Sequence, residues 1–309
     1  MGRASRTKVE TSRREKIAAQ QAAARRADRR RRILLASGSV LVVVAVVLTF
    51  VIIKLNSKSP TSSTVTGASN GPTGAALASV VHNVTTVPAS TLDTVGPGTF
   101  DNKIQTITGN PAALTSGGKP EMLFIGAEYC PYCGVARWAM IVALSRFGTF
   151  SGLSTVHSSS SDVYANTPSW SFYKSTYTSK YLTFTPVEQY TNVPDASSPS
   201  GYTPLQNLTS AQEALLAKYD VAPYTSENGS IPFVDFGNKY LMNGSPFIPS
   251  VLDGLSWATI ASDLHNPNSA AAKAVDGTAN YFTAAICKMT GNQPASACTS
   301  AVQSLESQL

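Results

Sequence analysis

Apolar positions along the chain form one long uninterrupted run and several shorter runs separated by polar segments. The long run, residues 33–53, contains no charged residue over 21 positions. As an α-helix it would be about 31 Å long, which matches the hydrocarbon core of a bilayer. The pattern therefore predicts a transmembrane helix over residues 33–54, separate from a folded part that follows it.

The shorter apolar runs predict a domain that mixes strands and helices. Residues 122–127 are expected to form a buried strand and residues 134–144 a helix, with a turn at 145–151 and a loop at 192–204. A capped helix is expected at 209–219. Further elements are expected as short helices near 77–81 and 91–92, an edge strand at 104–107, strands at 153–157 and 181–187, a strand–turn–strand hairpin at 230–240, and helices at 255–264 and 268–289. This succession predicts an α/β fold with a mixed sheet flanked by helices.

The charge distribution orients the predicted span. Residues 1–32 hold 12 of the 24 Lys and Arg residues but only 3 of the 18 Asp and Glu residues, so the basic balance belongs to this segment. Basic residues beside a span favour a cytoplasmic location, which predicts a basic cytoplasmic tail and an extracytoplasmic C-terminal part. A cleaved signal peptide is the alternative, but the run is too long and no A-x-A site follows it.

The remaining chain divides by composition into a linker and a domain. Residues 55–74 are rich in Ser, Thr, Pro and Gly, which is typical of a flexible spacer. Residues 75–309 are expected to form the extracytoplasmic domain. Because an apolar span follows the arginine cluster directly, the cluster is interpreted as a topology signal, and nucleic-acid binding is not expected.

Two cysteines lie where the predicted strand 122–127 meets the predicted helix. In Cys130-Pro131-Tyr132-Cys133 the thiols would occupy the first helical turn, where unpaired N–H groups and the helix dipole stabilise a thiolate. Cys130 is expected to be the more exposed thiol and the nucleophile, and Cys133 the resolving thiol. A structural disulfide is the alternative, and a buried Cys130 would argue for it.

The residues around the two cysteines are expected to tune them. Pro131 fixes the backbone for helix entry without losing a useful N–H. Tyr129 precedes the first cysteine, and Tyr132 can act sterically or through its hydroxyl. Glu128 is the nearest carboxylate, but we expect it to be exposed.

With this motif and two later features, the chain resembles the thioredoxin superfamily over roughly residues 75–290. The resemblance rests on the strand that runs into the CPYC motif, on Ile231-Pro232 before a strand, and on the Gly237–Lys239 hairpin turn followed by a C-terminal helix. It implies a thioredoxin-like fold and a cis-proline at Pro232, which would place the Ile231 backbone beside Cys130 to dock a substrate strand. The CPYC dipeptide is similar to that of glutaredoxins, whereas the general layout resembles DsbA-type oxidoreductases.

The spacing between motif and proline implies an insertion, placed at roughly 158–208. Residues 153–190 also resemble a prokaryotic membrane-anchored family of unknown function, family 929, which implies no substrate. One position departs from the thioredoxin pattern. Phe124 stands where thioredoxins carry a buried Asp that assists proton transfer, so this base is absent or supplied from elsewhere.

The other two cysteines, Cys287 and Cys298, bracket a short turn near the C-terminus. In an oxidising compartment a structural disulfide is expected there. A second redox pair and a zinc site formed by all four cysteines are alternatives, but the spacing is atypical of zinc knuckles. A copper site that combines the CxxC motif with His157 is a further alternative. It is not the favoured interpretation, and no metal and no cofactor are expected.

These observations predict a membrane-anchored extracytoplasmic thiol–disulfide oxidoreductase that acts on protein thiols and disulfides through a mixed disulfide. Its expected partners are extracytoplasmic proteins, the membrane through residues 33–53, and a membrane redox partner that recycles the dithiol. Oxidation is the favoured direction. The alternative is a non-catalytic thioredoxin-fold binding or chaperone module with structural disulfides.

Overall fold

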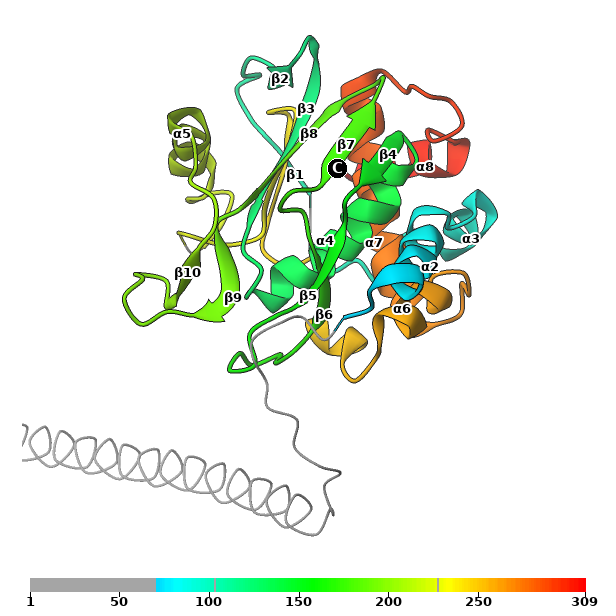
Figure 1. Ribbon diagram of the computed structural model, residues 1–309. Helices are drawn as coiled ribbons and strands as arrows, with labels where there is room; N and C mark the ends of the chain where they lie inside the picture. The colour runs from blue at the N-terminus through cyan, green and yellow to red at the C-terminus, as the bar shows by residue number, and fades with distance from the viewer. Residues whose placement is uncertain (1–70, 103, 227) are drawn as a thin grey trace, which may run out of the picture. The chain divides into compact units, whose positions relative to one another are not determined.

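A mixed sheet of six strands lies at the centre of the computed structural model, which describes residues 71–102, 104–226 and 228–309 (Figure 1). Neighbouring strands pair in the order β1–β12–β11–β3–β2, and β8 also pairs with β3. Only the β3–β8 pairing is parallel. Their bounds are β1 (Gln105–Thr106), β2 (Thr115–Ser116), β3 (Lys119–Gly126), β8 (Thr183–Glu188), β11 (Phe233–Phe236) and β12 (Tyr240–Asn243). The predicted mixed α/β fold with a mixed central sheet is confirmed.

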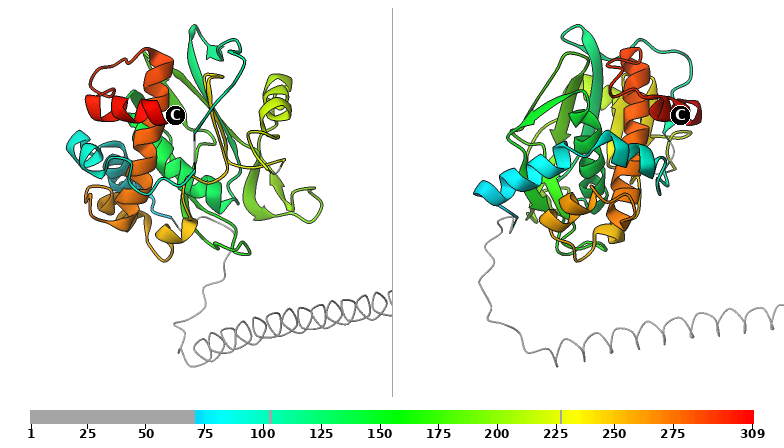
Figure 2. Two further views of the ribbon diagram at one scale, coloured as in Figure 1. Left: turned by 180° about the vertical axis from the view of Figure 1, so that it is seen from behind. Right: turned by 90° about the vertical axis from the view of Figure 1, so that its right-hand side faces the viewer.

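Strand β3 is buried on both faces because helices cover both sides of the sheet. Met122 and Phe124 face the larger apolar core, and Leu123 and Ile125 face the smaller one. This alternation follows from the period of two in a strand. Figure 2 shows α5 (Ser210–Tyr219) on one side of the sheet, with α4 (Pro131–Ser145) and α7 (Ala270–Thr290) on the other.

The remaining helices gather around α4 and α7 (Figures 1 and 2). They are α2 (Gly74–Thr85), α3 (Ala89–Val95), α6 (Trp257–Asp263) and α8 (Ser300–Leu305), with the 3₁₀ turns η1 (Pro249–Leu252) and η2 (Glu306–Gln308). One close approach requires glycine, because a Cβ on Gly277 of α7 would lie 2.7 Å from the Gly98 Cα. The loop after α3 can therefore pack directly on the α7 backbone.

The segment predicted as one insertion, 158–208, contains a strand of the central sheet, and this boundary was wrong. Strand β8 pairs with β3 in parallel from Glu121–Thr183 to Gly126–Glu188. The additional structure lies before and after β8 in sequence as three two-stranded sheets, of which two are hairpins and the third, β4–β7, flanks the β5–β6 hairpin. These are β4 (Gly148–Ser151) with β7 (Thr176–Ser179), β5 (Ser154–His157) with β6 (Pro168–Ser171), and β9 (Tyr190–Pro194) with β10 (Tyr202–Pro204).

Strand β4 was expected to lie in a turn at 145–151, and most of the β9–β10 hairpin in a loop at 192–204. Residues 192–204 are rich in small polar residues and prolines, which hide the alternating pattern that identifies a strand. Strand β4 pairs with β7, more than 20 residues later, so local sequence does not reveal that pairing.

The predicted tail, transmembrane helix and most of the linker lie outside the described residues. Within residues 71–309, with the two gaps noted above, no helix has the length and apolar character needed to cross a membrane.

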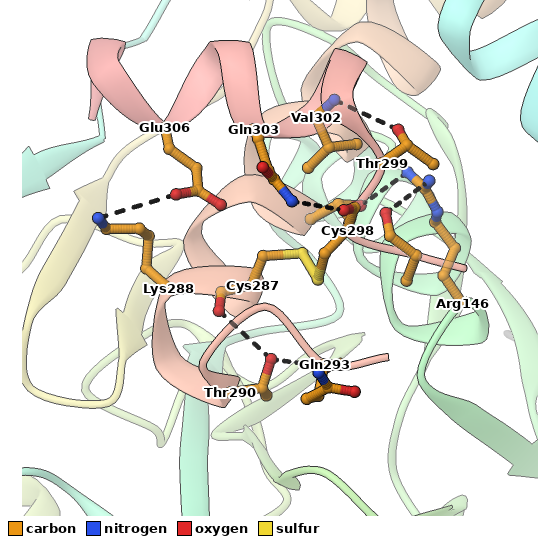
Figure 3. Close-up of a disulfide and its surroundings, with 12 residues drawn as sticks. Arg146, Cys287, Lys288, Thr290, Gln293, Cys298, Thr299, Val302, Gln303 and Glu306 are labelled. Atoms are coloured by element: carbon orange, nitrogen blue, oxygen red, sulfur yellow. Dashed lines mark hydrogen bonds and ion pairs between the residues drawn. A yellow bond between two sulfur atoms is a disulfide. The ribbon is translucent and has the colours of Figure 1, made fainter. Parts of the chain in front are cut away.

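A disulfide closes the C-terminal part of the domain, where Cys287 at the end of α7 is bonded to Cys298 (Figure 3). Both cysteines are buried. The turn between them is held by the Thr290 hydroxyl, which donates to the Gln293 carbonyl at 2.7 Å. Arg146, which caps the C-terminus of α4, donates to the Ala297 carbonyl at 2.8 Å, so the turn also packs on the end of the motif helix.

Helix α7 buries an acid that has no hydrogen-bond partner among the described residues. Asp276 is completely buried, and neither of its carboxylate oxygens is hydrogen-bonded. Burial raises its pKa to about 8, because the charged form would lose its hydration. The folded chain therefore holds this carboxyl protonated at pH values where the unfolded chain ionises it.

Replacing both cysteines of the disulfide (Cys287→Ala with Cys298→Ala) should destabilise the domain by about 2–3 kcal/mol, as expected for closing a loop of this length. Urea unfolding of the two proteins under non-reducing conditions measures this difference. A change below about 0.5 kcal/mol would show that the bond does not staple the fold.

The stability of the wild-type chain should fall as pH rises between about 4 and about 8, by up to about 1.4 kcal/mol per pH unit from Asp276 alone. The sign is negative because the folded state binds one more proton than the unfolded state in this window. In Asp276→Asn this contribution should vanish, which urea unfolding near both ends of the window measures. Asp253→Asn, at an exposed position, is the control and should keep the wild-type pH dependence.

Candidate dithiol site

The CPYC motif lies between the end of β3 and the first turn of α4. Cys130 is the N-cap of α4, and Pro131 is the first residue of the helix. The Cys130 sulfur accepts a hydrogen bond from the Cys133 N–H at 3.2 Å. The thiol therefore satisfies one of the free N–H groups of the first turn, as a capping oxygen would.

Cys130 is the more exposed of the two thiols, as expected, but both are buried. Its exposed fraction is 4%, against 0% for Cys133. The additional two-stranded sheets cause the burial of Cys130, because they pack against Tyr129, the residue before it. The Tyr129 ring stacks on Tyr202 of β10 at 4.2 Å, and the Tyr129 carbonyl accepts the Ser159 N–H at 2.7 Å.

The two thiols have opposite acid–base properties. Burial alone would raise the pKa of Cys130, but hydrogen bonds from the Cys133 thiol and N–H, the Arg137 charge and the Tyr132 N–H outweigh it, so this pKa is lowered. For Cys133, burial dominates and raises the pKa well above its ordinary value. Cys130 is therefore the thiol that ionises more readily, as a nucleophile and resolving pair requires.

The predicted docking residues lie beside the first thiol although they are 101 positions away in sequence. The Cys130 Sγ lies 3.8 Å from the Ile231 carbonyl oxygen, and the Ile231–Pro232 peptide is cis. The Pro232 carbonyl accepts the Gly244 N–H at 2.9 Å, which ties this loop to the end of β12. A backbone segment thus passes directly alongside the sulfur.

Tyr132 lies on the outer side of the motif. Its ring is partly exposed and meets Tyr164 edge to face at 5.7 Å. With Asp101, Asn102, Ser245, Phe247 and Ile248 it lines a surface groove of about 370 Å³. Ile248 is 54% exposed, so the groove presents an apolar wall next to the motif.

Glu128 is buried, and the expectation that it is exposed was wrong. Its exposed fraction is 8%, and the Ser171 hydroxyl of β6 donates to its carboxylate at 2.5 Å. Burial is the main reason why its pKa is raised. The carboxyl is enclosed because the β5–β6 hairpin covers the end of β3, a pairing that the sequence analysis did not foresee.

The sequence analysis missed a buried ion pair directly beneath the motif. Arg137 of α4 donates from Nε and Nη2 to the Glu188 carboxylate at 2.9 and 2.6 Å, and both side chains are fully buried. Arg137 also donates to the Ala127 carbonyl at 2.7 Å and to the Ser169 hydroxyl at 3.2 Å. The available signal was an arginine within the otherwise uncharged helix 134–144.

Phe124 does occupy the strand position below the motif. Its ring lies under the Arg137 guanidinium, with the Arg137 Cζ 5.5 Å from the ring centroid. A Cβ placed on Gly126 would lie 2.5 Å from the Phe124 ring and 3.1 Å from the Cys133 Sγ. An aromatic ring and a cation therefore fill the space below Cys133.

The histidines lie in separate surroundings. His157 packs edge to face on Trp257 at 4.4 Å, and the His265 ring contacts the Asn83 carbonyl at 2.9 Å. In the part of the chain that the structure describes, no group of three or more His, Cys, Asp or Glu residues is arranged to hold a metal ion.

Comparison with known proteins yields one family. The family model described as a domain of unknown function (DUF929) matches residues 105–288, which include the motif, the ion pair and Pro232. No curated protein and no solved structure matches the chain.

Proposed function

The chain belongs to the DUF929 family, a domain of unknown function, and we propose that it is a membrane-anchored extracytoplasmic thiol–disulfide oxidoreductase. The observation that carries the proposal is the surroundings of Cys130. Its sulfur caps a helix, accepts the Cys133 N–H at 3.2 Å and lies 3.8 Å from the Ile231 carbonyl. A purely structural dithiol would need neither the lowered pKa of the first thiol nor an adjacent backbone edge.

The connectivity of the central elements supports a thioredoxin-like fold. The motif strand β3 is followed by α4, a parallel partner β8, the antiparallel hairpin β11–β12, and α7. This order matches the thioredoxin pattern that the motif itself suggests. The hairpins on either side of β8 are then additions to a smaller core.

The chemistry follows from the unequal thiols. The Cys130 thiolate attacks a substrate disulfide, forming a Cys130–substrate bond and expelling one substrate sulfur as a thiolate. Cys133 then loses its proton and attacks Cys130, which releases the second substrate sulfur and leaves the Cys130–Cys133 disulfide. The reverse sequence oxidises a substrate dithiol.

The substrate class is an extended protein segment. The groove lined by Tyr132, Phe247 and Ile248 offers apolar surface next to the motif. The Ile231 backbone lies on the neighbouring side of Cys130. Together they favour a polypeptide over a small thiol.

The cellular arrangement rests on sequence alone. The uncharged run at 33–53 and the basic tail before it favour a single-pass anchor with the domain outside the membrane. An external enzyme requires a dedicated electron supply to work as a reductase, so oxidation, with a membrane partner that recycles the dithiol, is the proposed direction.

One observation favours a second candidate, a non-catalytic binding module. Cys130 is only 4% exposed, and a reactive cysteine needs access to its substrate. In the proposed enzyme, the segments that pack on Tyr129 must move before a substrate sulfur can reach Cys130.

Three proteins separate the two candidates: the wild type, Cys130→Ser and Cys133→Ser, each as the full chain in detergent. With a peptide disulfide, the reduced wild type should form the Cys130–Cys133 bond, and Cys133→Ser should accumulate a mixed disulfide, because its resolving thiol is absent. Cys130→Ser should form neither. Mass spectrometry of the acid-quenched reactions measures each species.

Thiolate absorbance and the reduction potential of the pair complete this test. The catalytic proposal expects a Cys130 pKa below about 8.5 and a potential above about −300 mV. A higher pKa together with a more negative potential, and no mixed disulfide in Cys133→Ser, would establish the non-catalytic module instead.

A further inference from the structure

We propose that Arg137 is a positioning residue of the dithiol, whose guanidinium stabilises the Cys133 thiolate when that thiol resolves the mixed disulfide. The inference rests on the proposed function. It names a group that assists Cys133 although Phe124 stands at the position where the thioredoxin pattern has a buried acid. Its support is the placement of the buried Arg137 guanidinium and of its carboxylate partner, Glu188.

The helix places Arg137 under the second thiol. Residues four positions apart lie on the same face of an α-helix, so Arg137 follows Cys133 by one turn. The guanidinium is then fixed by the two Glu188 oxygens, the Ala127 carbonyl and the Ser169 hydroxyl. A fully buried guanidinium with this many partners cannot reorient toward solvent.

The Ala127 peptide links the cation to both thiols. Its carbonyl accepts a hydrogen bond from Arg137 at 2.7 Å and also accepts the Cys130 N–H at 3.3 Å. Its N–H interacts with the Cys133 sulfur. The guanidinium and the Cys133 sulfur therefore interact with the carbonyl and the N–H of one residue, Ala127, and the Phe124 ring lies against the guanidinium.

The two charges of the ion pair act unequally on the two thiols. The charge of Arg137 favours the thiolate form of both Cys130 and Cys133. Glu188 lies in β8, and its charge acts on Arg137 and Glu128. The other ionisable groups against the thiols are the phenols of Tyr129 and Tyr132, whose own pKa values are raised.

The resolution step is where this charge matters. Cys133 must give up its proton before its thiolate attacks the Cys130 sulfur, and burial opposes that ionisation. In the attack the Cys130–Cys133 bond forms, the bond from Cys130 to the substrate sulfur breaks, and the electron pair leaves with the substrate thiolate, which is then protonated. A fixed cation lowers the cost of the buried thiolate without itself exchanging a proton.

The test uses a symmetric aromatic disulfide that releases a coloured thiolate twice, first on attack by Cys130 and again on resolution by Cys133. The pH dependence of the second phase gives the ionisation midpoint of Cys133 in the full chain. Arg137→Gln with Glu188→Gln removes both charges but keeps a hydrogen-bonding pair. Its midpoint should rise by about one pH unit and its resolution rate near neutral pH should fall roughly tenfold.

Two further variants give the opposite sign and the control. Glu188→Gln leaves the Arg137 charge uncompensated, so its midpoint should fall below that of the wild type. Lys288→Gln with Glu306→Gln removes the ion pair beside the Cys287–Cys298 disulfide and leaves Arg137 and Glu188 in place, so its midpoint should not move. A purely structural role for the pair would shift the first two variants in the same direction or not at all, which would overturn the proposal.

Folding is checked by circular dichroism, since an unpaired buried charge is destabilising. If either variant at Glu188 fails to fold, Arg137→Lys decides, because it keeps the charge and loses the two-pronged contact. Its midpoint should stay near the wild-type value, and an upward shift of about one unit would refute the charge role. A wild type that releases only one equivalent, or none, would instead refute the proposed function.

Discussion

The buried ion pair between Arg137 and Glu188 is the constraint on which the structure around the dithiol depends. Removing two charges from water is costly, and the cost is offset only where every donor and acceptor finds a partner. Arg137 on α4 therefore requires Glu188 on β8, the carbonyl that follows β3, and a hydroxyl on β6. Helix, sheet and hairpin are fixed relative to one another by this single requirement.

The same network explains why the additional hairpins belong to the domain. Glu188 also accepts the Phe172 N–H at 3.2 Å, and its own N–H donates to Gln206 at 2.9 Å. Trp257 of α6 donates its indole N–H to the Ser169 carbonyl at 2.7 Å. Phe172, before β8, thus completes the partners of the buried carboxylate, and Gln206, after β8, satisfies the backbone N–H of the same residue.

Sequence alone predicts the parts of this fold that depend on local pattern. The β3–α4 unit shows an apolar strand, a helix start with proline, and an apolar helix in direct succession, and the α5 start shows its capping residues. Pairings across long separations leave no such trace. The enclosure of Glu128 depends on Ser171, 43 positions later, and that of Cys130 on a ring of β10.

Arg137 is a second case in which local sequence does not reveal a distant partner. A charged residue in an apolar helix is visible in the sequence, but its meaning depends on a carboxylate 51 positions away. Burial of Cys130 likewise separates the geometry of the site from its accessibility. The local motif predicts the first, and the tertiary structure alone determines the second.

The three tryptophans of the chain lie within this one packing unit. Trp138 on α4 donates to the Pro168 carbonyl at 2.9 Å and meets Trp170 of β6 at 5.1 Å. Trp257 donates to the Ser169 carbonyl of the same strand. They surround the strand that also supplies Ser169 to Arg137. The intrinsic fluorescence of this protein is consequently a local signal, sensitive to rearrangement beneath the cysteines and almost blind to the far side of the sheet.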